Sequence, residues 1–267
     1  MRWDYLYRYY DRLSEGGFKR LLNEGFNCQN TMINYLPTFT APGHSCIYTG
    51  TVPALHGIAA NDWMDVASGK EIYCCEDNSV KPLGGGNAGL MSPRNLLTTT
   101  IADELRMATN FTSKSIGISL KDRGAIIPAG HQANGAFWYD SESGNFISSN
   151  YYFEQLPFWV QQFNARNLAD SFLNLGWETL YAINTYTQST TDDNAFEGTL
   201  KGETKPTFPH NTFKKSSKGV LRQIPAGITF TRLMAQAAIE GENLGANKTT
   251  DFLAVSFSTT DYIGHMF

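Results

Sequence analysis

The sequence is poor in charge and has no long apolar segment. Only 17% of its 267 residues are charged, and the net charge is −4. No basic block or stripe occurs, which argues against general nucleic-acid binding. No apolar run approaches 18 residues, so we predict no membrane span. The length is sufficient for a single large domain with a sizeable core.

Cysteine is scarce as well, and none of the four cysteines forms a C-x-x-C pair (Cys28, Cys46, Cys74 and Cys75). The pattern therefore argues against a zinc site built on cysteine. The adjacent Cys74 and Cys75 suit either disulfide pairing in an oxidising compartment or free buried thiols. The low charge, with many Asn, Thr, Ser and Gly residues, leans towards a periplasmic or secreted protein.

Strand-like and helix-like segments alternate along the chain. We predict helices at 3–22 (interrupted at Gly16–Gly17), 43–50, 94–109, 157–175 and 228–244. We predict strands at 26–35, 115–120, 125–129 and 251–257, and a hairpin at 136–152. Residues 177–213 are polar and suit a surface insertion. This alternation predicts an α/β sandwich with a mostly parallel central sheet.

Residues 37–61 contain a hydroxyl in a distinctive setting. Thr40 lies just before Pro42 and Gly43, where a loop would turn into a short helix, and Pro favours the first turn of a helix. A hydroxyl there lies near the positive end of the helix dipole, where a phosphate or a metal ion can bind. The alternative is a capping Thr followed by an ordinary turn.

Three polar clusters follow predicted strands: Thr40 after 26–35, Lys121 and Arg123 after 115–120, and Asp261 and His265 after 251–257. Ligands of open parallel sheets bind beyond the carboxyl ends of the strands. We therefore expect these side chains to meet at one edge of the sheet.

Each cluster has a chemical and a structural interpretation. One helical turn would place Asp261 and His265 on one face, as half of a zinc site; otherwise they are a capping Asp and a partly buried His. Lys121 and Arg123 alternate in a segment predicted to be extended, so both would project to one side and suit phosphoryl oxygens. The alternative is a solvated surface pair. Asn61 offers a neutral amide donor, or is a turn residue.

Four motifs occur in this order: T-A-P-G-H from Thr40, I-Y-T-G-T-V-P-A-L-H-G-I-A-A-N ending at Asn61, K-D-R from Lys121, and S-T-T-D-Y-I-G-H ending at His265. Together they resemble the alkaline phosphatase superfamily in its type I phosphodiesterase/nucleotide pyrophosphatase branch. The match is best to bacterial zinc-dependent alkaline phosphatases, which are phosphate monoesterases, and it covers essentially the whole chain. The resemblance implies a three-layer αβα sandwich, with residues 1–267 as a partial catalytic domain and a cap or insertion at about 130–225.

The resemblance also implies roles for the site residues. Thr40 would be the nucleophile and a ligand of one zinc ion, and Asp261 and His265 would bind the other zinc. Asn61 would contact a phosphoryl oxygen, and Lys121 and Arg123 would mark a monoesterase. The implied reaction is zinc-dependent hydrolysis of small-molecule phosphate monoesters through a phosphothreonine, with two Zn²⁺ per complete site. We expect His44 and His56 to be structural, and we do not expect His131 or His210 to be ligands.

The chain covers only part of the family pattern. The family's first metal-binding Asp would precede Met1, and its last Asp-His pair and final His would follow position 267. We therefore expect a fragment that is incomplete at both ends, lacks any signal peptide and is inactive alone. Two alternatives remain: a phosphodiesterase or nucleotide pyrophosphatase, and a non-catalytic phosphate-binding module without metals. The oligomeric state stays open.

Overall fold

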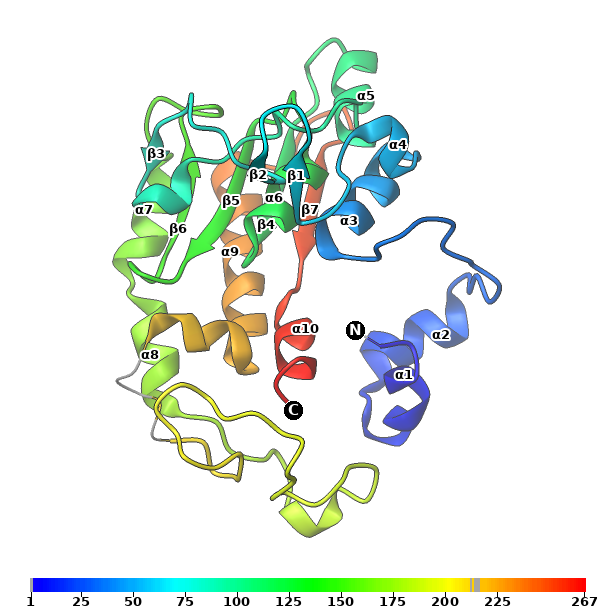
Figure 1. Cartoon of the computed structure of the whole chain (residues 1–267), viewed down its shortest axis with the longest axis vertical. Coiled ribbons are helices and arrows are strands. Elements are labelled where there is room, and N and C mark those ends of the chain that lie inside the picture. Colours follow the sequence, from blue (N-terminus) through cyan, green and yellow to red (C-terminus); the bar gives the residue numbers. More distant parts are fainter. Residues whose placement is uncertain (1, 212, 214–216) are drawn as a thin grey trace.

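A computed structural model describes residues 2–211, 213 and 217–267 (Figure 1). Its main sheet has the strand order β3 (Pro82–Leu83), β6 (Asn145–Ser149), β5 (Gly135–Asp140), β4 (Ser115–Ser119) and β7 (Phe252–Ser256). β4 runs parallel to both β5 and β7, whereas β5 and β6, and β6 and β3, are antiparallel. The predicted α/β fold is confirmed, and the described sheet is mixed because β5 and β6 form the predicted hairpin.

Helices cover both faces of this sheet, as the resemblance implies (Figure 1). On one face, α7 (Phe158–Ala165), α8 (Leu168–Leu175) and α9 (Ala226–Glu242) share a core with Ile116 and Ile118 of β4. On the other face lie α3 (Thr40–Thr49) and α6 (Asp122–Ala129). Gly117 allows α6 to pack closely, since a Cβ at this position would lie 2.0 Å from the backbone oxygen of Ala125. This close contact fixes α6, which carries Arg123 and has Lys121 as its N-cap residue.

The remaining elements are short. The helices are α1 (Tyr5–Arg8), α2 (Arg20–Glu24), α4 (Pro53–His56), α5 (Ile101–Ala108) and α10 (Thr259–Gly264). β1 (Asp62–Asp65) and β2 (Lys70–Tyr73) form a separate antiparallel pair. The predicted strands at 115–120 and 251–257 and the predicted helix at 228–244 are confirmed within a few residues. No described helix is both long and apolar enough to cross a membrane.

The predicted strand at 26–35 is wrong. The segment is an irregular and mostly exposed loop, in which Phe26 is 95% exposed and Met32 86% exposed. A strand requires a neighbour that accepts its backbone hydrogen bonds, and no described strand pairs with this segment. Thr40 therefore follows a loop and not a strand.

The extended conformation predicted for Lys121 to Arg123 is found only at Lys121, since Asp122 and Arg123 are helical, and the strand predicted at 125–129 is wrong. Lys121 occupies the N-cap position of α6, and the helix runs on to Ala129. The cause is burial, because every residue from Gly124 to Ala129 is buried in the described fold. A short apolar run that is buried all round shows no period that separates a helix from a strand.

Three predicted helices have different limits. The helix predicted at 94–109 begins only at Ile101, because Thr100 and Asp103 form a capping box. The helix predicted at 157–175 is divided into α7 and α8 at Asn167, whose φ is 49°. The helix predicted at 3–22 consists of short pieces on both sides of Gly17, and the last of these ends at Gly25.

The region predicted as a cap or insertion, at about 130–225, is heterogeneous. β5 and β6 belong to the central sheet, whereas 177–211 is irregular apart from one short turn of helix at Ile183–Thr185. Residues 212 and 214–216 of this region lie outside the described residues. That the region acts as a cap stays a prediction.

Candidate active site

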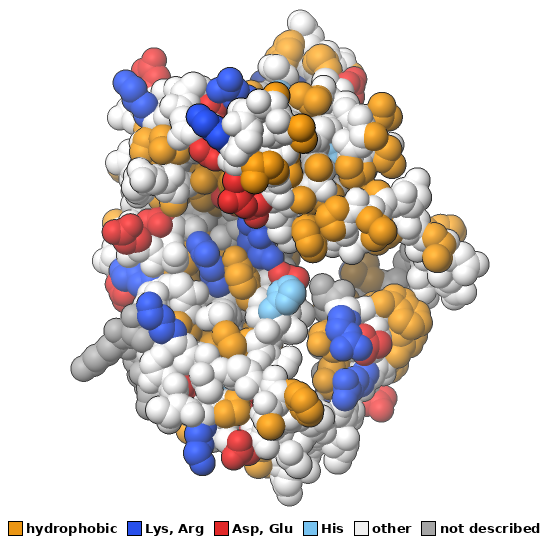
Figure 2. Space-filling model, viewed as in Figure 1, with side chains coloured by type: hydrophobic (Ala, Val, Ile, Leu, Met, Phe, Trp, Pro, Cys, Tyr) orange, Lys and Arg blue, Asp and Glu red, His pale blue; other side chains and the backbone are white. Residues whose placement is uncertain are grey.

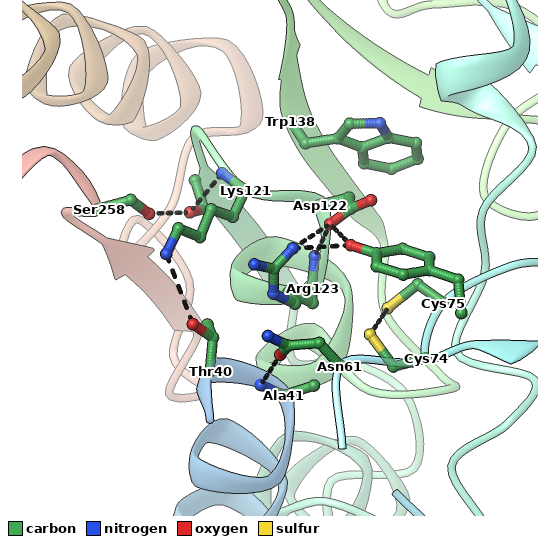
Figure 3. Close-up of polar contacts among 12 residues, drawn as sticks. Thr40, Ala41, Asn61, Cys74, Cys75, Lys121, Asp122, Arg123, Trp138 and Ser258 are labelled. Atoms are coloured by element: carbon green, nitrogen blue, oxygen red, sulfur yellow. Dashed lines mark hydrogen bonds and ion pairs between the residues drawn. The ribbon is translucent and has the colours of Figure 1, made fainter. Parts of the chain in front are cut away.

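Thr40 is the first residue of α3, and its hydroxyl does not cap the helix. Phe39 occupies the N-cap position, and no side chain caps this end. The backbone oxygen of Thr40 accepts a hydrogen bond from the ring Nδ1 of His44, one turn later in the helix, at 2.9 Å. The Thr40 hydroxyl is instead 3.4 Å from Nζ of Lys121 (Figure 3).

Asn61 is oriented by α3. Its Oδ1 accepts the backbone N–H of Ala41 at 3.0 Å. An N–H donor requires the oxygen of the amide, so this bond assigns which way the amide points. The amide nitrogen then faces away from the helix, towards the space in front of Thr40 (Figure 3). Asn61 therefore offers N–H donors beside the Thr40 hydroxyl.

Lys121 lies between Thr40 and Asp261. Its side chain is only 7% exposed, and its Nζ contacts a carboxylate oxygen of Asp261 as well as the Thr40 hydroxyl. The ammonium also lies 4.7 Å from the ring centroid of Tyr262. These contacts bring together residues that are 81 and 140 positions apart in the chain. The described fold thus gathers three of the predicted side chains around one positive charge.

The backbone of Lys121 is fixed by a pair of serines to which the sequence assigned no role. Ser119 accepts the Lys121 N–H at 3.1 Å, and its hydroxyl lies 3.0 Å from that of Ser258. Both serines lie at the ends of parallel strands, since Ser119 is the last residue of β4 and Ser258 follows β7. Ser258 begins the S-T-T-D-Y-I-G-H motif, whereas no pattern in the sequence distinguishes Ser119 from an ordinary residue at a strand end.

Arg123 lies two residues further along, on α6, and is held by a polar network. Its Nη1 donates to the hydroxyl of Tyr73 at 2.8 Å and lies 3.6 Å from Oδ1 of Asp122. Burial alone would lower the pKa of Arg123, but the nearby Tyr73 and Asp122 outweigh it and raise the pKa. The guanidinium stays charged, and Figure 3 shows it facing the space that Thr40, Asn61 and Lys121 also face.

Asp261 and His265 are one turn apart on and just after α10. His265 Nε2 is 3.6 Å from Oδ1 of Asp261, so the predicted helical pairing is confirmed. Partial burial by itself would raise the pKa of Asp261. The hydrogen bond and the positive charge of Lys121 more than offset burial and lower that pKa. Asp261 is therefore ionised beside an imidazole whose side chain is 80% exposed.

The other histidines have structural partners. His44 donates from Nδ1 to the Thr40 carbonyl, so its Nε2 accepts from the Ser256 hydroxyl at 3.2 Å; burial lowers its pKa. His56 is fully buried, and its Nδ1 accepts the N–H of Ile58. His131 pairs with Asp103 and His210 with Glu203. No disulfide links the four cysteines in the described fold, in which Cys74 and Cys75 are buried thiols.

The predicted ligands suit zinc in kind but are too few. Zinc in proteins takes nitrogen and oxygen donors such as those of His265 and Asp261, usually four in all. The part of the chain that the structure describes contains no group of three or more His, Cys, Asp or Glu side chains that could hold a metal. The Lys121 ammonium between Thr40 and Asp261 shows that these two oxygen donors already surround a positive charge. The residues described here fit part of a zinc site.

Comparison with known proteins extends the resemblance. Residues 1–267 match the family described as Type I phosphodiesterase / nucleotide pyrophosphatase. The chain is 56% identical over 270 residues to the alkaline phosphatase PhoV of Synechococcus elongatus, covering 100% of this chain and 49% of PhoV. It is also 56% identical over 273 residues to a Myroides odoratus protein named calcium-transporting ATPase, covering 100% of this chain and 50% of that protein.

Solved structures agree with these similarities. The structure of the alkaline phosphatase PafA matches this chain with a TM-score of 0.98 and 51% identity, covering 100% of this chain and 52% of PafA. A second PafA structure, in which a threonine, an asparagine, a lysine and an arginine are substituted, matches with a TM-score of 0.97 and 49% identity, covering 100% of this chain and 53% of that one. The chain spans about half the length of the curated relatives that it matches.

Proposed function

Because the chain belongs to the type I phosphodiesterase/nucleotide pyrophosphatase family, we propose that it carries the nucleophile and the phosphate-binding groups of an alkaline phosphatase acting on phosphate monoesters. The observation that carries the proposal is the position of Lys121, whose ammonium contacts both the Thr40 hydroxyl and the Asp261 carboxylate. The whole enzyme would contain this chain and the remaining length found in its relatives.

Thr40 is the proposed nucleophile. Its oxygen attacks phosphorus in line with the bond to the leaving alcohol, that bond breaks, and a phosphothreonine forms; water then releases phosphate and restores the hydroxyl. An alcohol is a weak nucleophile at neutral pH and must be activated. The Lys121 ammonium lies 3.4 Å from the Thr40 oxygen and stabilises negative charge on it.

Asn61, Lys121 and Arg123 are the proposed phosphate-binding groups. The transition state of phosphoryl transfer spreads charge over the outer oxygens, so catalysis depends on positioning and on stabilising that charge. A monoester dianion has one more charged oxygen than a diester, and two cations on this side favour the monoester. The substituted threonine and asparagine of the PafA variant are spaced like Thr40 and Asn61, and its lysine and arginine like Lys121 and Arg123, which supports these assignments.

Zinc is the proposed cofactor, at two ions per complete site. Thr40, Asp261 and His265 would hold it together with ligands from outside this chain. When bound, zinc would supply Lewis-acid stabilisation of the attacking and leaving oxygens. Asp261 is suited to this role because its lowered pKa keeps it ionised.

The test uses the full-length protein and its Lys121→Ala variant. Removing a strong donor to a transition-state oxyanion costs about 3–4 kcal/mol, so aryl monoester turnover should fall by about two orders of magnitude. Aryl diester turnover should fall much less. An equal loss for both esters would contradict the monoesterase and favour a phosphodiesterase or nucleotide pyrophosphatase.

Zinc content separates the enzyme from the remaining alternative, a non-catalytic phosphate-binding module. Elemental analysis of the full-length protein should find about two zinc ions per chain, and Asp261→Asn with His265→Ala should reduce that content. A parent protein without zinc that still binds inorganic phosphate would support the module instead.

The low charged fraction leads us to propose a periplasmic or secreted location. Fractionation of cells that express the full-length protein should recover the activity outside the cytoplasm. Recovery in the cytoplasm would contradict this part of the proposal.

A further inference from the structure

A basic pocket lies next to the candidate active site, with Tyr262 in its lining. The pocket has a volume of about 390 Å³, and its lining includes Lys201, Ser217, Arg222, Gln223 and Tyr262. Such a volume suits a small ligand or part of one. Figure 2 shows several Lys and Arg side chains gathered near the centre of this face, beside an exposed histidine.

Arg222 is held in place but forms no ion pair with a described residue. Its Nη2 donates to the backbone oxygen of Tyr139 at 3.0 Å, and its guanidinium carbon lies 5.5 Å from the Tyr139 ring centroid. Its Nε is buried and has no hydrogen-bond partner among the described residues. Among the ion pairs of those residues, none involves Arg222 or Lys201, although the positive charge of Arg222 contributes to the lowered pKa of Asp140.

An unpaired and partly buried cation costs free energy that a bound anion would recover. A guanidinium presents several donors in a rigid fork, which matches a carboxylate or a phosphate. Lys201 adds a second positive charge, while Ser217 and Gln223 add neutral polar groups to the same lining. The chemistry of the pocket therefore selects for an anion.

Tyr262 connects this pocket to the catalytic groups. Its ring centroid lies 4.7 Å from Nζ of Lys121 and 6.0 Å from the guanidinium carbon of Arg222. The two cations are thus separated by no more than the sum of these distances. A substrate with its phosphate at Thr40 would need only a short organic chain to reach Arg222.

We propose that this pocket binds a second negatively charged group on the alcohol portion of the phosphate monoester. This inference rests on the proposed function, and it deepens that function by naming a substrate class: small phosphate monoesters whose alcohol also carries a carboxylate or a further phosphate. Arg222 and Lys201 determine specificity, and neither takes part in bond breaking.

The experiment compares two substrates with the full-length protein: the phosphate monoester of a short ω-hydroxy carboxylic acid and the corresponding amide. The ratio of kcat/KM for the acid over that for the amide should be about tenfold for the parent, because a charge-assisted hydrogen bond is gained. Arg222→Gln and Lys201→Gln should each bring the ratio close to one while leaving kcat/KM for the amide within about twofold.

Lys205→Gln provides the charge-matched control. Lys205 is exposed on the same segment and does not line the pocket, so its substitution should leave the ratio unchanged. A parent ratio near one, or an equal fall in all three variants, would overturn the inference. If Arg222→Gln does not fold, the kcat/KM ratio of Lys201→Gln still tests the inference, because Lys201 is exposed. Failure of the proposed function would look different, since neither ester would then be hydrolysed.

Discussion

The hydroxyl of Tyr73 donates a hydrogen bond to Oδ1 of Asp122 at 2.5 Å, across 49 positions of chain. Burial, followed by the charge of Asp122, raises the pKa of Tyr73, so the phenol stays protonated and remains a donor. The same hydroxyl accepts a bond from Nη1 of Arg123. Tyr73 therefore links Asp122 to the guanidinium that we assign to phosphate binding.

Tyr73→Phe should weaken the positioning of Arg123 without removing its charge. A hydrogen bond to a charged group contributes about 1.5–3 kcal/mol, so monoester kcat/KM should fall by about tenfold or more. Diester hydrolysis should be affected less. The measurement is kcat/KM for both esters with the full-length protein.

Tyr151→Phe is the matched control, because it removes one hydroxyl that bonds only a backbone oxygen, that of His131. It should leave both rates unchanged. If Tyr73→Phe behaved like this control, Tyr73 would have no positioning role.

Asn61 should reveal two separate roles when it is replaced by Asp and by Ala. An aspartate at 61 can still accept the Ala41 N–H, whereas alanine leaves that donor without its partner. Stability should fall by about 1 kcal/mol in Asn61→Ala and by little in Asn61→Asp. Monoester hydrolysis should show the reverse order, because a carboxylate repels the phosphate.

Urea denaturation and ester kinetics on the two variants check this crossed pattern. If Asn61→Asp were the more active of the two, the amide nitrogen would not contact the substrate.

Asp103 and His131 should make stability depend on pH. Burial alone would raise the pKa of Asp103, but hydrogen bonds from His131, Gln132 and Thr100 hold it at about 2. The bond to Asp103 raises the pKa of His131. Asp103 thus contributes stability above pH 4 that is lost as the pH falls towards 2, and His131 contributes stability that is lost as the pH rises through its folded pKa.

The free energy of unfolding should fall by roughly 2 kcal/mol as the pH falls from 4 towards 2, because a difference of one pKa unit corresponds to about 1.4 kcal/mol. Urea unfolding between pH 2 and pH 9 measures both losses of stability, the one at low pH and the one at higher pH. Asp103→Asn should make stability depend less on pH in both ranges. The exposed Asp62 supplies the control Asp62→Asn, in which stability should depend on pH as it does in the parent protein. If the pH dependence of stability were unchanged in Asp103→Asn, it would have to come from other titratable groups.

Gly117→Ala should destabilise the fold strongly. The added Cβ would lie 2.0 Å from the backbone oxygen of Ala125 and 2.9 Å from Cβ of Ala129, and neither atom can move without displacing α6. Overpacking of this kind costs about 1–3 kcal/mol, and we expect the upper end of that range.

Gly16→Ala is the control, since a Cβ there meets nothing within 4 Å. Urea unfolding should separate the two variants clearly. Similar stabilities for both would show that β4 and α6 can move apart at little cost.

Much of the site was predictable because its motifs are local. One turn of helix is enough to pair Asp261 with His265, and the apolar run at 115–119 is enough to place Lys121 at the end of β4. Tyr73 was not predictable, since nothing in its neighbourhood distinguishes it and its partners lie on α6. The loop at 26–35 was mistaken for a strand because alternation does not show whether a pairing partner exists.

The sequence by itself determined the α/β class, the order of the motifs and the types of side chain available at the site, because composition and short periodicities depend on near neighbours. Only the tertiary structure decided which of these side chains meet. Packing of α6 on Gly117 puts Lys121 between Thr40 and Asp261 and turns Arg123 towards Tyr73. The tertiary structure also places Arg222 6.0 Å from the ring centroid of Tyr262, with its Nε buried and without a hydrogen-bond partner among the described residues. Contacts between residues far apart in the chain depend on how the layers pack, and no local pattern encodes that packing.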